Sequence, residues 1–145
     1  MVNAQILVHS NGDAASDRLI NAIRSAKKKY PNVDNRPVLI HGQVLREDQI
    51  DDIAELGIFP SLFPMHTFYW GDWHRNSVLG PERGARISPT RSATERGVTF
   101  TIHNDAPIVP PDIIRLVWAA SNRKTRSGKT LGAEERLSTY EALVA

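Results

Sequence analysis

Short apolar runs of strand length recur along the chain, and longer amphipathic segments follow the first two. The runs are rich in β-branched and aromatic residues, as buried strands are. They span residues 5–9, 37–41, 58–64 and 98–105. Residues 14–30 and 45–57 carry apolar side chains at helical spacing, and Pro31 and Gly57 are suited to end these helices. The pattern predicts two strand–helix units and two further strands.

The second half of the chain is less regular. Residues 91–97 and 111–122 have the composition of helices, and residues 133–145 are a candidate for a last helix after a polar linker. Residues 65–89 show no clean periodicity, so we expect a long loop there. A loop of that length inside one domain is usually functional.

Strands that alternate with helices predict an α/β fold with parallel strands buried between helical layers. The 145 residues are the size of one ordinary domain, and nothing suggests two. In such folds the functional groups collect at the carboxyl ends of the strands.

Histidines stand at these strand ends. They are His9, His41, His66 and His103, and Asp105 follows the last of them. Imidazole and carboxylate groups that converge on one edge of a sheet suit a divalent metal such as zinc, with one position left open for water. Asp105 could serve there as a ligand or as the general base. A single strand-end histidine could instead cap a turn, but the repetition favours a metal site.

Aromatic side chains surround the polar residues of the segment 66–74. A loop that covers a substrate would have this composition, and so would a compact loop packed by its own aromatic side chains. Both interpretations stay open. The first makes His66, Trp70 and Asp72 candidates for substrate binding.

Composition argues against several other functions. Eighteen basic and sixteen acidic residues give a net charge of only +2, and the basic clusters at 27–30 and 122–126 lie far apart, so we expect no nucleic-acid partner. Cysteine is absent, no apolar run is long enough to cross a membrane, and the first residues do not resemble a signal peptide. We therefore expect a cytoplasmic protein without a membrane partner. No dinucleotide-binding or serine-hydrolase motif occurs, and the sequence RSGKT at 126–130 lacks the first glycine of a phosphate-binding loop.

Several segments resemble, in order, the C-terminal half of the metal-dependent amidohydrolase superfamily. They are HSNGDAASDRLINAI, LIHGQ, PSLFPMHTFYWGD, TIHNDAPIVPPDIIRLVWAASNR and GAEERLSTYEAL. The branch most similar includes N-substituted formamide deformylase. The resemblance covers essentially the whole chain and implies that residues 1–145 form a partial (β/α)8 TIM barrel, roughly its last four βα units.

The resemblance also implies roles for individual residues. His9 and His41 correspond to metal ligands that end the fifth and sixth strands, and Asp105 to the metal-associated general base that ends the eighth. His66 and His103 correspond to residues on the substrate side. The implied reaction is hydrolysis of a C–N bond in a small amide-type molecule by a water that a divalent metal, here expected to be zinc, activates.

Two features of that family are missing from this chain. Its five histidines include no histidine-x-histidine pair, which the family has at the first strand, and the family's bridging lysine at the fourth strand is also missing. We therefore expect a fragment that binds zinc weakly or not at all and is inactive by itself. We expect it to form homo-oligomers or to pair with the missing N-terminal half. The alternative is a non-catalytic α/β interaction module that retains ancestral histidines.

Overall fold

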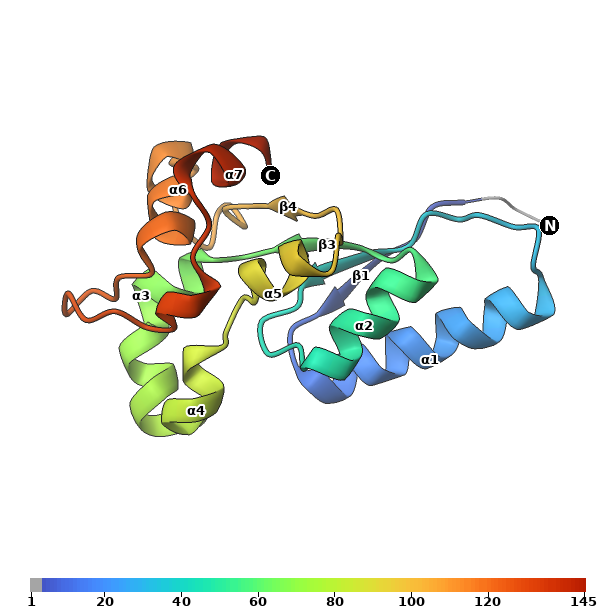
Figure 1. Cartoon of the computed structure of the whole chain (residues 1–145), viewed down its shortest axis with the longest axis horizontal. Helices are drawn as coiled ribbons and strands as arrows, with labels where there is room; N and C mark the ends of the chain where they lie inside the picture. Colours follow the sequence, from blue (N-terminus) through green and yellow to red (C-terminus); the bar gives the residue numbers. More distant parts are fainter. Residues whose placement is uncertain (1–3) are drawn as a thin grey trace.

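The computed structural model describes residues 4–145, which form a four-stranded parallel sheet with helices packed against it (Figure 1). The strands lie side by side in chain order and are β1 (Leu7–Ser10), β2 (Val38–His41), β3 (Phe59–Leu62) and β4 (Thr101–Ile102). Ser10 pairs with His41, and His41 pairs with Leu62, so these strands end level with one another. The predicted α/β fold with parallel strands is confirmed.

Helices α1 (Asp13–Lys29) and α2 (Glu47–Leu56) pack on the same face of the sheet (Figure 1). Their apolar stripes are buried in one core with the sheet residue Leu39, and the helical contributors include Ile20, Ile23, Ile50 and Ile53. Burial of each such side chain stabilises the fold by about 1.5–3 kcal/mol. Both helices end near the predicted residues, α2 at Gly57 with a left-handed φ of 61°.

The expectation of a loop over residues 65–89 is wrong. This segment forms α3 (Met65–Trp73), a π-helical turn η1 (His74–Val78) and α4 (Gly80–Ala85), and α5 (Thr90–Glu95) follows. The sequence did not predict α3 because this helix contacts other segments on more than one of its sides. A Cβ atom at Gly71 would lie 2.9 Å from Thr125 Cγ2, so even the most polar stretch of α3 is in contact with another segment. A helix buried on several sides has no amphipathic period for a sequence pattern to detect.

The C-terminal part forms α6 (Ile113–Asn122), a short 3₁₀ turn η2 (Ala133–Glu135) and α7 (Thr139–Val144). The single helix expected over 133–145 is therefore broken, because Leu137 is buried in the core and Ser138 starts a new helix in a capping box with Glu141. None of the helices in the described part of the chain combines the length and the apolar character that crossing a membrane requires.

Two buried residues connect the C-terminal part to the strand ends. The guanidinium of Arg123, which is fully buried, donates hydrogen bonds to the backbone carbonyls of Leu131, Ser88, Ile87 and Ala85. Ser88 in turn donates its N–H to the carbonyl of Gln43 (2.7 Å) and its hydroxyl to the carbonyl of Phe63 (2.9 Å). These hydrogen bonds hold together the segments that follow β2 and β3.

Candidate metal centre

The same short pattern follows three of the four strands. A histidine at the strand end is followed two residues later by a side chain with an amide or carboxylate oxygen. The three pairs are His9 with Asn11, His41 with Gln43, and His103 with Asp105. Parallel pairing places all three pairs at the carboxyl edge of the sheet, so their side chains converge.

The tightest group among the described residues is His41, His103 and Asp105. Each of the three offers a nitrogen or oxygen atom within 4.8 Å of the others. Nε2 of His41 lies 4.0 Å from Oδ2 of Asp105, and the His41 and His103 ring centroids are 5.1 Å apart. His9 lies on the other side of His41, with 4.5 Å between the ring centroids. Two imidazoles and a carboxylate are a donor set that a divalent ion such as zinc accepts.

The backbone is strained at two members of this group. His41 has a φ of 80° and Asp105 a φ of 52°, in the left-handed region that residues with a side chain rarely adopt. Such a conformation costs about 1–3 kcal/mol and persists where the surrounding structure enforces it, often at functional sites. At His41 the neighbour Gly42 continues the left-handed turn, and a Cβ atom there would lie 2.7 Å from Leu45 Cδ1. The His-Gly sequence thus permits the turn that ends β2.

Burial keeps these imidazoles in the form that binds a metal. Loss of hydration lowers the pKa of His41 and of His103, although the nearby Asp105 carboxylate opposes the shift at both rings. Nδ1 of His41 and Nε2 of His103 are buried without a hydrogen-bond partner. An unpartnered buried nitrogen atom is costly, and a metal ion would satisfy Nε2 of His103, while on His41 the ring nitrogen that lies 4.0 Å from the Asp105 carboxylate is Nε2. The residues present therefore fit a divalent metal.

The structure groups the predicted ligands somewhat differently from the expected set. His41 and Asp105, two of the three predicted ligands, lie close together. His103, which the sequence resemblance placed on the substrate side, belongs to the tight group, while His9 lies beside His41 outside it. The i, i+2 spacing shared by His103 and Asp105 is the sequence signal for this proximity.

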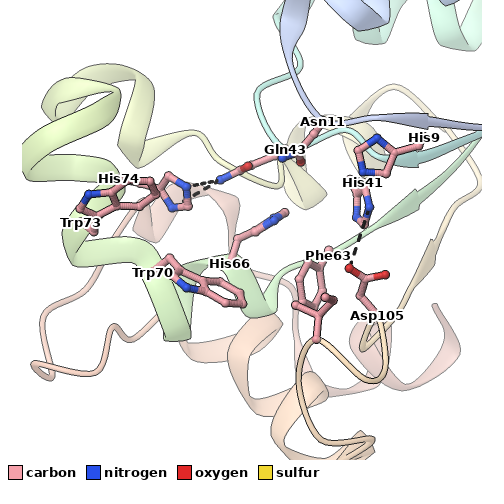
Figure 2. A pocket seen from close by; sticks show the side chains of 11 residues that line it. His9, Asn11, His41, Gln43, Phe63, His66, Trp70, Trp73, His74 and Asp105 are labelled. Atoms are coloured by element: carbon pink, nitrogen blue, oxygen red, sulfur yellow. Dashed lines mark hydrogen bonds and ion pairs between the residues drawn. The ribbon is translucent and has the colours of Figure 1, made fainter.

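A cavity of about 260 Å³ opens in front of this group (Figure 2). The side chains of His9, His41 and Asp105 line one end of it. His66 and Trp70, both on α3, also line the cavity, together with Asn11, Gln43, Phe63, Trp73, His74 and Ile108. Nε2 of His74 lies 3.0 Å from the side-chain nitrogen of Gln43, which donates to the neutral ring. Burial lowers the pKa of His74 and lowers that of His66 to about 3.

The structure does not bring Asp72 to this cavity. Its carboxylate accepts hydrogen bonds from the hydroxyl (2.8 Å) and the backbone N–H (3.2 Å) of Ser127, so it holds the turn after α6. His103 is not among the residues that line the cavity, and its ring stacks on that of Phe63, with 5.2 Å between the ring centroids. Sequence reasoning missed Asn11 and Gln43, which only the repeated spacing after His9 and His41 could have indicated.

Histidine and carboxylate groups at the carboxyl edge of a parallel α/β sheet are the arrangement of a metal-dependent hydrolase, and the observed sheet is consistent with part of a (β/α)8 barrel. The chain belongs to the amidohydrolase family: the sequence model described as "Amidohydrolase family" matches residues 2–145. It is also 29% identical over 142 residues to the protein named "Putative amidohydrolase YtcJ" of Bacillus subtilis (strain 168). That match covers 96% of this chain and 26% of the Bacillus protein.

Two solved structures share the fold. An uncharacterized metal-dependent hydrolase from Pyrococcus furiosus superposes with a TM-score of 0.75 at 27% identity, over 96% of this chain and 26% of that one. A second from Pyrococcus horikoshii OT3 gives a TM-score of 0.78 at 23% identity, over 96% and 27% of the two chains. The chain therefore spans about a quarter of the length of these relatives.

Proposed function

We propose that this chain supplies part of the active site of a metal-dependent enzyme that hydrolyses a C–N bond in a small amide-type molecule. The observation that carries the proposal is the group His41, His103 and Asp105, whose ligand atoms lie within 4.8 Å of one another and in which Nε2 of His103 is buried without a hydrogen-bond partner. Family membership supports a hydrolase. The finer assignment, to a branch that includes N-substituted formamide deformylase, rests on the sequence motifs alone.

His41, His103 and Asp105 would hold the metal, with His9 beside them as a further ligand from β1. Zinc suits these nitrogen and oxygen donors. When bound, a divalent ion supplies Lewis acidity, which polarises a carbonyl group and makes water nucleophilic near neutral pH. Asp105 has a part-exposed carboxylate that lines the cavity, so it can accept a proton from a water there as the general base. His66 and Trp70 would contact the substrate.

We propose that the chain does not turn over substrate by itself and works together with the rest of such an enzyme, either on another chain or in a homo-oligomer. Its five histidines include no histidine-x-histidine pair that could complete the donor set. A site made only of His41, His103 and Asp105, without the histidine-x-histidine pair, would bind a metal ion more weakly than a site with all of these ligands.

The direct test is the zinc content and zinc affinity of the purified chain, measured by elemental analysis and by titration against a chromophoric chelator. We expect the titration to reach one zinc ion per chain only at high zinc concentration, with weak affinity, and we expect His41→Ala, His103→Ala and Asp105→Asn each to weaken that affinity by about tenfold or more. His74→Asn is the matched control, because this histidine lines the same cavity outside the cluster.

Two outcomes would count against the proposal. Wild-type chain that takes up no zinc would favour a non-catalytic interaction module, and an equal loss in the control variant would mean that zinc binds elsewhere. His9→Ala distinguishes the ligand sets, since a loss as large as that of His103→Ala would make His9 a ligand in its own right.

A further inference from the structure

The loop between α6 and η2, residues 123–132, is largely polar and exposed but has a fixed shape. Lys124 and Thr130 form an antiparallel bridge, and the N–H of Thr125 donates to the carbonyl of Lys129 (2.9 Å). The loop is therefore a tight hairpin with an exposed tip. The sequence RSGKT at this tip lacks the first glycine of a phosphate-binding loop, so nucleotide binding does not explain its cations.

Helix α3 holds the tip of the hairpin, residues 126–129, in place. The backbone N–H of Arg126 donates to the carbonyl of Phe68 (3.1 Å). Ser127 donates its hydroxyl (2.8 Å) and its N–H (3.2 Å) to the carboxylate of Asp72. Figure 1 shows this loop beside α3 at one end of the molecule. A binding element that is already fixed loses less conformational entropy when a partner docks.

Two arginines lie over neighbouring aromatic rings of α3. The guanidinium of Arg126 is 5.7 Å from the ring centroid of Tyr69. That of Arg115 on α6 is 5.2 Å from the ring centroid of Phe68, and the two ring centroids are 5.0 Å apart. Each ring attracts the cation above it. A stacked guanidinium keeps the N–H groups along its edge free, and such groups donate to carboxylates in pairs.

The cations of the loop have no carboxylate partner in the described part of the chain. Arginines elsewhere form ion pairs with aspartate or glutamate side chains, among them Arg24, Arg46, Arg86, Arg91 and Arg96. Arg115 shares Asp112 at 3.5 Å, and none of the ion pairs among residues 4–145 involves Arg126 or Lys129. The tip thus carries a local excess of positive charge, which attracts an acidic partner and steers it to this place.

Apolar side chains of α6 continue this surface. The ring of Trp118 is 38% exposed and packs edge-on against that of Phe68, with 5.7 Å between the centroids. Ile114, one helical turn before Trp118, is 76% exposed. A single exposed apolar residue needs no explanation. Two of them beside a cluster of unpaired cations make a mixed surface, which suits a peptide with both acidic and apolar side chains.

We propose that the cationic loop surface, formed by Ile114, Arg115, Trp118, Arg126 and Lys129, docks an acidic segment of a partner protein. Carboxylates of that segment pair with the two arginines and the lysine, and an apolar side chain packs on the tryptophan. A short acidic segment fits better than a nucleic acid, because the cations gather at one turn, whereas a nucleic acid needs cations along its whole backbone. None of these residues lines the metal cavity, so the docking surface does not depend on the proposed hydrolysis.

Fluorescence anisotropy with a labelled synthetic peptide tests this surface on the whole chain. The probe carries glutamates on both sides of one tryptophan, and its control has glutamine in place of each glutamate. We expect the probe to bind about tenfold or more tightly than the control, because the carboxylates supply most of the attraction. We also expect its affinity to fall as the salt concentration rises.

Variants locate the binding. Arg126→Glu should weaken binding of the probe by about tenfold or more, since an attractive contact becomes repulsive. Tyr69→Leu and Ser127→Ala keep the net charge but loosen the loop, and each should weaken binding about threefold. Ser127 is exposed, so its variant gives this test even where Tyr69→Leu does not fold. Lys28→Glu is the matched control, because Lys28 is an exposed cation at the end of α1.

Several results would overturn the proposal. A chain that does not bind the probe, or binds the glutamine control equally, has no site for an acidic segment. An equal loss in Arg126→Glu and Lys28→Glu would mean that binding follows net charge alone. Tighter binding of a single-stranded thymidine oligonucleotide than of the probe would identify a nucleic-acid surface instead.

Repeating the titration with zinc and with chelator separates this proposal from the hydrolase function. Neither should change the affinity for the probe, and a change would place the peptide in the metal cavity and contradict the docking surface. A chain that takes up no zinc but binds the probe through Arg126 would count against the hydrolase function and leave the docking surface standing.

Discussion

His66 shows how burial determines the chemistry of a single residue. Its ring is 8% exposed on the first turn of α3, and loss of hydration, helped by the neighbouring imidazoles, lowers its pKa from 6.5 to about 3. The ring therefore stays neutral in the folded chain at any physiological pH. A neutral buried imidazole can accept or donate a hydrogen bond to an uncharged substrate, but it cannot act as a general acid near pH 7.

The lowered pKa of His66 predicts a pH dependence of stability. Between pH 6.5 and about 3 the unfolded chain binds a proton that the folded chain does not, so stability is lost as the pH falls through this window. We expect His66 alone to reduce the free energy of unfolding by about 1.4 kcal/mol between pH 7.5 and 5.5. Urea denaturation of chelator-treated chain at both pH values measures this loss.

His66→Phe is the companion variant, since it keeps an aromatic ring of similar shape and removes the titrating group. It should lose less stability than the wild type on acidification. The remaining loss belongs to His41, His74 and His103, whose pKa values burial also lowers. If the free energy of unfolding fell equally with pH in wild type and variant, His66 would not be protected from protonation in the folded chain.

At the scale of elements, the loop between α6 and η2 packs closely against the end of α4. Gly132 has a φ of 66°, and a Cβ atom there would lie 1.7 Å from the carbonyl oxygen of Ala85, one of the groups that Arg123 holds. Gly128 in the same loop has a φ of 81° but nothing within 4 Å of its Cβ position. Both glycines adopt a left-handed backbone conformation, but only Gly132 has other atoms close to the position of a Cβ atom.

This difference predicts unequal effects of alanine. Gly128→Ala should cost about 1 kcal/mol, since only the left-handed conformation penalises it. Gly132→Ala should cost several times more, on the order of 3–5 kcal/mol, because the α4–α5 connection must move away from Arg123. Urea midpoints of the two variants compare them directly, and equal midpoints would mean that the loop does not pack as described.

At the scale of the whole molecule, the described part of the sheet has an open edge at β1, whereas on the other edge strand, β4, the N–H of Ile102 donates to the carbonyl of Ala145. β1 pairs only with β2, and Leu7 on β1 is 61% exposed. An unpaired strand edge is a template for pairing with another chain, and a barrel removes such edges by closing. The open sheet agrees with a chain that spans about a quarter of its relatives.

We therefore predict that the purified chain associates at micromolar concentration, measured by size-exclusion chromatography with light scattering. Leu7→Lys places a charge on the open edge and should shift the chain toward monomer. Leu143→Lys is the control, because Leu143 is comparably exposed on α7, away from this edge. A monodisperse wild-type monomer would contradict the prediction.

Much of the fold and part of the site could be predicted from local pattern. The strands near His9 and His41 are short apolar runs, and the helices α1 and α2 each bury one apolar face. Both patterns can be recognised in the sequence alone. The pattern failed at α3, where Gly71 and its neighbours pack in several directions. It also failed for Asp72, since a carboxylate next to aromatic residues has the same local sequence whether it faces a cavity or caps a turn at Ser127.

The sequence by itself determined the α/β class, the parallel strands and the recurring histidines, because these depend on periodicity and on residue types that are local in the chain. Only the tertiary structure decided which of those side chains meet. His103 joins His41 and Asp105 through the pairing of strands and the left-handed turns at His41 and Asp105, and Asn11 and Gln43 reach the same cavity from separate strands. Such contacts depend on register and backbone direction between distant segments, which no local pattern specifies.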